Sequence, residues 1–125
     1  MSNFTELIDR YIDTWNETDD ERRRELIAQT WTEDATYIDP MMKGDGHAGI
    51  NDMIQAVQER FAGHRLRRTS DIDAHNGRVR FSWELAPEGG NPVAGGIDFG
   101  VIAADGRLQT ITGFFDNAPA VQTRH

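Results

Sequence analysis

The chain has 125 residues, a length that suits one domain with its own buried core and is too short for two. It contains no cysteine, which excludes disulfides and thiol chemistry. Its 21 acidic residues outnumber its 13 basic residues, and this negative charge argues against a partner with a phosphate backbone. No apolar run matches a membrane span and the N-terminal residues lack signal-peptide features, so we expect a cytoplasmic protein that binds neither nucleic acid nor membranes.

Two amphipathic helices are predicted in the first quarter of the chain. Apolar residues recur at helical spacing from Phe4 to Trp15, and polar residues occupy the other face. Thr18 and Glu21 have the capping-box spacing, which predicts that a second helix begins at Thr18. This helix would turn three apolar side chains inward, namely Leu26, Ile27 and Trp31. The short connection between the two helices predicts an antiparallel pair.

Two short groups of arginines interrupt the acidic sequence. Residues 22–24 are three consecutive arginines, and Arg65, Arg67 and Arg68 form the second group. Acidic residues flank both groups, so we expect each to be a solvated face rather than a binding patch.

The next segment predicts a short strand, a loop and a third helix. Residues 35–39 contain β-favouring side chains and stop at Pro40, so they are predicted to form a strand. The glycine-rich sequence MMKGDGHAG after Pro40 is predicted to be a loop. Apolar residues then recur at helical spacing from Ile50 to Phe61, and Gly63 is placed to cap the C-terminal end of that helix.

From His64 onward the spacing of apolar residues changes from helical to two, the period of a strand. Residues 78–85 alternate strictly, and Asn76-Gly77 and Asp105-Gly106 have the composition of two-residue hairpin turns. Four strands are predicted, joined as an antiparallel meander, at residues 64–75, 78–86, 93–104 and 107–116. Residues 117–125 follow no pattern and are predicted to be disordered.

These elements predict a single α+β domain over residues 1–125. We expect a cone-shaped, curled antiparallel sheet with the three helices packed on its concave face. A long sheet must twist and curl, and helices across its concave side then enclose a space that side chains need not fill. The sequence therefore predicts an internal pocket.

Asp98 is the polar residue whose position is the most unusual. The other residues on its face of the strand are glycines or apolar residues, namely Ala94, Gly96, Gly100 and Ile102. An exposed strand face would carry threonine, lysine or glutamate instead. We therefore predict that Asp98 faces the pocket, where the glycines leave room for something other than side chains.

Asp39 and Tyr11 are ambiguous by themselves. Asp39 precedes Pro40, so it either ends the strand as an Asx turn or points into the pocket on the same face as Tyr37. Tyr11 lies within the apolar stripe of the first helix, where a tyrosine is usually a core residue whose hydroxyl reaches one partner.

Four segments resemble a known family, namely RYIDTW, EDATYIDP, GHAGI and GGIDFGVIAADGRL. From about residue 4 to residue 116 the chain resembles the ketosteroid isomerase and SnoaL-like polyketide cyclase group of the nuclear transport factor 2-like superfamily. The resemblance implies an isomerase or cyclase that removes a proton next to a carbonyl group. It implies that Asp39 is the general base, and that Tyr11 and a protonated Asp98 donate hydrogen bonds to the oxyanion.

The resemblance implies a small apolar carbonyl compound as the substrate, and we expect no metal or other cofactor. Residues 41–46, rich in methionine and glycine, suggest a pocket mouth unlike a steroid site, so the reaction type carries over more readily than the substrate. Asp71, Asp73 and His75 share a strand face without a fourth ligand, which favours a solvated face over a metal site. The expected substrate-binding residues are Trp15, His47, Met53, Phe81, Trp83 and Phe115.

Other functions stay open at this point. The chain could be a non-catalytic binder of a small apolar ligand or a dimeric protein-interaction module of the same fold. Epoxide hydrolysis would need an arginine grouped with two aspartates around a water, and the sequence places none beside Asp98. Because the last strands have two apolar faces, we also expect a homodimer formed through the outer face of the sheet.

Overall fold

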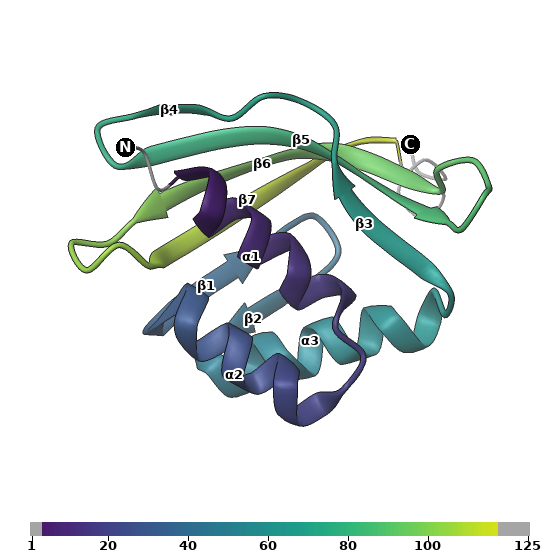
Figure 1. Cartoon of the computed structure of the whole chain (residues 1–125), viewed down its shortest axis with the longest axis horizontal. Coiled ribbons are helices and arrows are strands. Elements are labelled where there is room, and N and C mark those ends of the chain that lie inside the picture. The colour runs from purple at the N-terminus through teal and green to yellow at the C-terminus, as the bar shows by residue number, and fades with distance from the viewer. Residues whose placement is uncertain (1–3, 118–125) are drawn as a thin grey trace.

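Three helices and seven strands make up residues 4–117, the part of the chain that the computed structural model describes (Figure 1). The helices are α1 (Phe4–Asn16), α2 (Asp20–Thr30) and α3 (Gly46–Arg60). The strands are β1 (Trp31–Ile38), β2 (Lys43–Asp45), β3 (His64–Arg68), β4 (Asp73–His75), β5 (Arg78–Pro87), β6 (Ala94–Ile102) and β7 (Leu108–Asn117). The prediction for the C-terminal tail falls mostly on residues 118–125, outside the described residues.

The strands form one curled sheet in the order β2-β1-β7-β6-β5-β3, and β4 also pairs with β5. The α+β class is confirmed, and β5, β6 and β7 form the predicted antiparallel meander. One pair differs from the prediction, because β1 and β7 run parallel and make the sheet mixed. Parallel neighbours need a long connection, and here α3 and five strands lie between the two in the chain.

The tight turns form where their composition predicts them. Asn76 and Gly77 have φ angles of 50° and 75°, the left-handed conformation that a two-residue hairpin requires at both positions. The predicted strand at 64–75 is divided, because β3 and β4 pair with different parts of β5 and residues 69–72 lie between them.

Three boundaries differ from the prediction. α2 begins one residue after Asp19, whose side chain accepts a hydrogen bond of 2.9 Å from the Arg22 N–H, so Asp19 is the N-cap and not Thr18. Trp31 starts β1 instead of ending α2. The predicted loop contains β2, which pairs with β1 and passes close to the start of α3; a Cβ atom at Gly44 would lie 3.1 Å from the Gly49 carbonyl oxygen.

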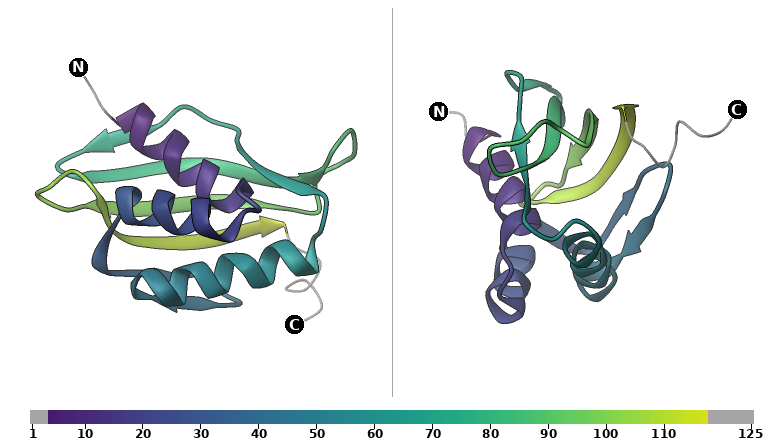
Figure 2. Two further views of the ribbon diagram at one scale, coloured as in Figure 1. Left: turned by 60° about the horizontal axis from the view of Figure 1, so that its bottom comes forward. Right: turned by 90° about the vertical axis from the view of Figure 1, so that its right-hand side faces the viewer.

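The helices lie on one side of the sheet, within its curve (Figure 2). Their apolar faces and the inner face of the sheet form one core, which includes Leu7, Ile8, Ile54, Phe81 and Ile111. None of the described helices is long and apolar enough to cross a membrane.

Arg23 corrects the expectation that the first arginine group is wholly solvated. Its side chain is 1% exposed, and its guanidinium group donates hydrogen bonds to Asn51 Oδ1 (2.8 Å), Gln58 Oε1 (3.0 Å), Asp20 Oδ1 (3.0 Å) and the Glu17 carbonyl oxygen (2.9 Å). These partners belong to α2, α3 and the segment after α1. The buried guanidinium therefore ties the three helices together behind the cavity described next.

Candidate functional site

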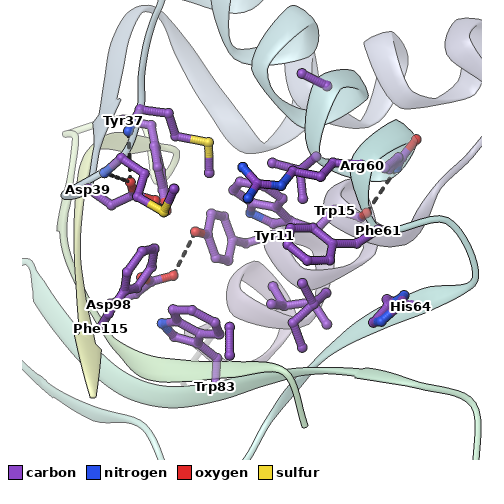
Figure 3. A pocket seen from close by; sticks show the side chains of 18 residues that line it. Tyr11, Trp15, Tyr37, Asp39, Arg60, Phe61, His64, Trp83, Asp98 and Phe115 are labelled. Carbon is purple, nitrogen blue, oxygen red and sulfur yellow. Dashed lines mark hydrogen bonds between the residues drawn. The ribbon is translucent and has the colours of Figure 1, made fainter. Parts of the chain in front are cut away.

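A cavity of about 340 Å³ lies between the helices and the concave face of the sheet (Figure 3). Its lining comes from α1, α3, the end of β1, and strands β3, β5, β6 and β7. Most lining side chains are apolar or aromatic, as in small-molecule sites generally. The structure brings Tyr11, Asp39 and Asp98 together on this lining, together with Tyr37.

Tyr11 and Asp98 are in direct contact, although they lie far apart in the chain. The Tyr11 hydroxyl donates a hydrogen bond of 2.7 Å to Asp98 Oδ2, and both residues are buried. Burial raises the pKa of the Tyr11 hydroxyl well above its usual value, and the negative charge of Asp98 raises it further. Tyr11 is therefore a neutral donor at physiological pH.

Asp98 is 2% exposed, and its carboxyl group is held partly protonated at neutral pH. Burial raises the pKa of Asp98 to about 7. The hydrogen bond from Tyr11 lowers the pKa of Asp98, and the charge of Asp39 raises it. The nearby Trp83 N–H also lowers this pKa, although it does not reach hydrogen-bond geometry. The other oxygen, Oδ1, is buried and has no hydrogen-bond partner among the described residues.

Asp39 is both the strand-ending turn and a cavity residue, so the two interpretations of its position are compatible. Its Oδ1 accepts hydrogen bonds from the N–H groups of Met41 (2.8 Å) and Met42 (3.0 Å), as an Asx turn requires. Its Oδ2 accepts a hydrogen bond of 2.7 Å from the Tyr37 hydroxyl. Hydrogen bonds donated to a carboxylate stabilise its charged form.

Tyr37 is a site residue that the sequence analysis did not assign. Burial raises the pKa of its hydroxyl well above the usual value, and the charges of Asp98 and Asp39 raise it further. The hydroxyl therefore stays a donor and holds Asp39 Oδ2 in place. The signal was present in the sequence, because Tyr37 and Asp39 were expected to share one face of the strand.

Gly113 is the second residue that the sequence analysis missed. It lies opposite Asp98 in the pairing of β6 with β7. A Cβ atom at this position would lie 3.0 Å from Asp98 Oδ1, 3.1 Å from Asp39 Cβ and 3.2 Å from the Tyr37 hydroxyl oxygen. Any larger residue would crowd these three side chains, so the glycine allows both aspartates to approach the same part of the cavity wall.

The expected substrate-binding residues divide into two groups. Trp15, Trp83 and Phe115 line the cavity. The other three, namely His47, Met53 and Phe81, lie outside the lining.

These three residues have structural contacts instead. Phe81 is covered by Tyr11, whose ring centre lies 5.8 Å from its own, and Met53 is buried in the core. His47 Nε2 lies 2.9 Å from the Trp31 carbonyl oxygen, so this ring is engaged with the start of β1. The helical and strand periods predicted correctly that Met53 and Phe81 face inward, but not which inward residues the cavity exposes.

The sequence analysis also missed the residues at the end of α3 that line the cavity, including Arg60 and Phe61, and His64 at the start of β3. Figure 3 shows Phe61 and His64 on the side of the cavity away from Asp39 and Asp98, and the Arg60 side chain extending from α3 toward the middle of the cavity. Epoxide hydrolysis would need an arginine between the two aspartates, and Arg60 does not occupy that place.

The polar groups of the cavity are suited to acid–base chemistry on a carbonyl compound. Asp39 presents a carboxylate, and three of its four lone-pair positions accept hydrogen bonds from the protein, which leaves one for a proton. Since Asp98 Oδ2 accepts the Tyr11 hydrogen bond, the proton of neutral Asp98 falls on Oδ1, the oxygen without a partner. A candidate base and a candidate donor thus lie on the lining of one largely apolar cavity.

Comparison with known proteins identifies the family of the chain. The model of the SnoaL-like domain family matches residues 8–111. A SnoaL-like protein from Agrobacterium tumefaciens, for which an isomerase activity has been proposed, is 39% identical in sequence. The two structures align with a TM-score of 0.88 over 94% of this chain and 100% of that chain.

Two further structures share the fold at lower identity. A protein from Sinorhizobium meliloti proposed as a polyketide cyclase is 17% identical, with a TM-score of 0.67 over 86% of this chain and 93% of that chain. A SnoaL-like protein from a Jannaschia species, also proposed as a polyketide cyclase, is 15% identical, with a TM-score of 0.67 over 90% and 86% of the two chains. No curated protein matches the sequence.

Proposed function

This chain belongs to the SnoaL-like domain family, and from that premise we propose that it is an enzyme that removes a proton from the carbon next to a carbonyl group. The substrate is a small, largely apolar molecule that fits the cavity of about 340 Å³. Isomerisation and aldol-type ring closure both begin with this step, and relatives in the family have been proposed to perform one or the other.

Asp39 is the base in this proposal. The C–H bond next to the carbonyl breaks, its proton goes to the Asp39 carboxylate, and the electron pair of the bond moves onto the carbonyl oxygen as an enolate. The enolate then either takes up a proton at another carbon, which is an isomerisation, or attacks a second carbonyl carbon, which closes a ring.

Asp98 stabilises the enolate oxygen in this proposal. Neutral Asp98, which is buried, donates a hydrogen bond from Oδ1 to that oxygen as negative charge develops there. Tyr11 acts through Asp98, because its hydroxyl donates to Asp98 Oδ2 and fixes the orientation of the carboxyl group. In this arrangement Tyr11 is a positioning residue rather than a direct donor to the substrate.

One observation carries the proposal: Asp98 Oδ1, a buried carboxyl oxygen without a partner among the described residues, and the side chain of Asp39 both lie next to Gly113. An unpaired buried polar atom is costly, since it has lost its hydration without gaining a protein partner. A bound carbonyl oxygen would supply the missing partner for Oδ1.

The test is exchange of the protons next to the carbonyl of a methyl ketone for solvent deuterium, followed by NMR. The wild-type protein should accelerate the exchange. The Asp39→Asn variant, which keeps the shape of the side chain but has no basic carboxylate, should slow exchange by about 10²- to 10⁴-fold while still binding the ketone. Equal exchange by both proteins, with equal binding, would mean that the cavity is a non-catalytic ligand site.

A further inference from the structure

The end of the cavity opposite the two aspartates has a different chemical character. Residues from the end of α3 and the start of β3 line it, and Figure 3 shows Phe61 and His64 on this side and the Arg60 side chain extending from it toward the middle of the cavity. Much of the remaining lining is apolar and includes Val57, Leu66, Leu85 and Ala94. The cavity is therefore acidic at one end and basic at the other, with apolar walls.

Arg60 has no acidic partner among the described residues. None of the ion pairs among residues 4–117 includes Arg60, although the chain has a formal net charge of -8. Arg60 is an exposed residue on the lining, and its guanidinium carbon lies 5.3 Å from the centre of the Phe61 ring, a cation–π contact. The planar guanidinium group has the geometry to bind a planar anion through two hydrogen bonds.

His64 and Gln58, the two neighbouring polar residues, differ in whether they have a nitrogen or oxygen atom free to bind a ligand. His64 Nδ1 lies 3.0 Å from the Ala62 carbonyl oxygen, and because a carbonyl oxygen only accepts, Nδ1 carries the proton and Nε2 is left for a ligand. Gln58 uses its amide group to bind Arg23 and two backbone carbonyl oxygens, so it belongs to the network between the helices. Arg60 is thus the positively charged residue on this part of the lining.

We propose that Arg60 binds a carboxylate of the substrate, so that the substrate is an apolar keto acid rather than a neutral ketone. This inference rests on the proposed function for the position of the carbonyl group, which lies at Asp98. The carboxylate lies at Arg60, and an apolar chain or ring system spans the distance between them. A guanidinium group and a carboxylate form paired, charge-assisted hydrogen bonds, which fix the direction in which the molecule enters the cavity.

The test is equilibrium binding of linear methyl-keto acids of increasing chain length, each compared with its methyl ester. Binding is followed by quenching of tryptophan fluorescence, since Trp15 and Trp83 line the cavity. At the best chain length, the acid should bind the wild-type protein about tenfold more tightly than the ester. The Arg60→Gln variant should bind acid and ester alike, and Arg60→Lys should keep part of the preference.

Arg65 provides the matched control. It is a nearby exposed arginine that lines a separate surface groove and not this cavity. Arg65→Gln removes the same charge and should leave the preference for the acid unchanged. Equal binding of acid and ester by the wild-type protein overturns the proposal, as does a preference that survives in Arg60→Gln or that disappears equally in Arg65→Gln.

Binding at equilibrium needs no turnover, so this test is separate from the test of proton abstraction. If Asp39→Asn exchanged protons as the wild-type protein does, the preference for the acid would still stand as a property of a ligand site. If the acid preference were absent, Asp39-dependent exchange of a neutral ketone would be unaffected.

Discussion

Asp98 and Asp39 border the same cavity, and their immediate surroundings suit them to opposite tasks. Asp98 has lost almost all contact with water, and burial raises its pKa to about 7, which favours the protonated acid. Asp39 instead faces two backbone N–H groups and the Tyr37 hydroxyl, which stabilise a carboxylate. In the proposed mechanism one aspartate therefore supplies the hydrogen-bond donor and the other supplies the base.

The raised pKa of Asp98 predicts a pH dependence of stability with a definite sign. The folded protein titrates this group at about 7 and the unfolded chain at about 3.8, so the folded state binds more protons between these values. The free energy of unfolding contributed by Asp98 therefore falls as the pH rises from about 4 through about 7 and is constant above that range.

The Asp98→Asn variant tests this sign, since an asparagine has a similar shape and does not ionise. Urea denaturation of the wild-type protein and the variant should be compared at several pH values between about 5 and 8. We expect the wild-type protein to lose stability relative to Asp98→Asn as the pH rises. A difference between the two proteins that does not change with pH would contradict the assignment.

Substitution of Gly113 should crowd the side chains of the site. Gly113→Ala places a methyl group within 3.0 to 3.2 Å of Asp98, Asp39 and Tyr37, so at least one of these side chains must move. We expect proton exchange to slow by at least about tenfold and stability to fall by about 1–3 kcal/mol. Gly49→Ala is the control, because its added methyl group would meet its neighbours at an ordinary 3.6 Å. Equal activity of the two variants would exclude a role for the gap at Gly113.

At the scale of elements, the site depends on contacts between segments that are far apart in the chain. α1 supplies Tyr11, the end of β1 supplies Asp39, and β6 supplies Asp98. The parallel pairing of β1 with β7 brings Tyr37 and Asp39 beside Gly113, and the antiparallel pairing of β7 with β6 brings Gly113 opposite Asp98. A shift of one residue in either pairing would turn one of these side chains to the outer face.

The arrangement of the helices depends on the buried side chain of Arg23. Arg23→Met should lower the free energy of unfolding by roughly 2–4 kcal/mol, because Asn51, Gln58 and a backbone carbonyl lose their donor. Arg24→Met removes an exposed ion pair to Asp20 and should leave stability nearly unchanged. Chemical denaturation of both variants measures the difference, and equal effects would show that burial of Arg23 contributes nothing.

The elements that could be predicted from the sequence are those whose signals are local. Apolar spacing of 3.6 residues located α1 and α3, the capping-box spacing located α2, and Asn76-Gly77 located a hairpin, because these patterns act over a few neighbouring residues. β2 and the first residues of β1 were missed. β2 depends on pairing with the end of β1, and the start of β1 pairs with β7 through Trp31 and Leu108, and no local pattern contains either pairing.

The same distinction holds for the site. The inward position of Asp98 could be predicted from the glycines and apolar residues on its own strand. The roles of Gly113 and Arg60 could not, because a gap between two aspartates and an unpaired charge at a cavity exist only once distant segments meet.

At the scale of the whole molecule, the outer face of the sheet carries apolar side chains in the middle strands. Phe114 is 58% exposed and Phe99 39% exposed, and Ile97 lies opposite Phe114 in the pairing of β6 with β7. Ile38 on β1 adds to the same face. Contiguous exposed apolar side chains of this kind favour association, so we propose that two copies of the chain pair through this face.

Sedimentation analysis tests the proposed dimer. The wild-type protein should have the mass of two chains, and Phe114→Glu should have the mass of one, because it places a charge at the centre of the apolar face. Glu84→Gln changes a half-buried position on neighbouring β5 and should remain a dimer. A wild-type mass of one chain at high concentration would contradict the proposal.

The central claim is that a bound carbonyl group lies between a protonated Asp98 and the Asp39 base. A crystal structure of the protein with a methyl-keto acid bound tests it most directly. We predict that the ketone oxygen lies within about 2.6–3.2 Å of Asp98 Oδ1, with the neighbouring carbon facing the Asp39 carboxylate. A ketone oxygen directed away from Asp98, or a ligand bound with its carbonyl group at the Arg60 end, would contradict the account.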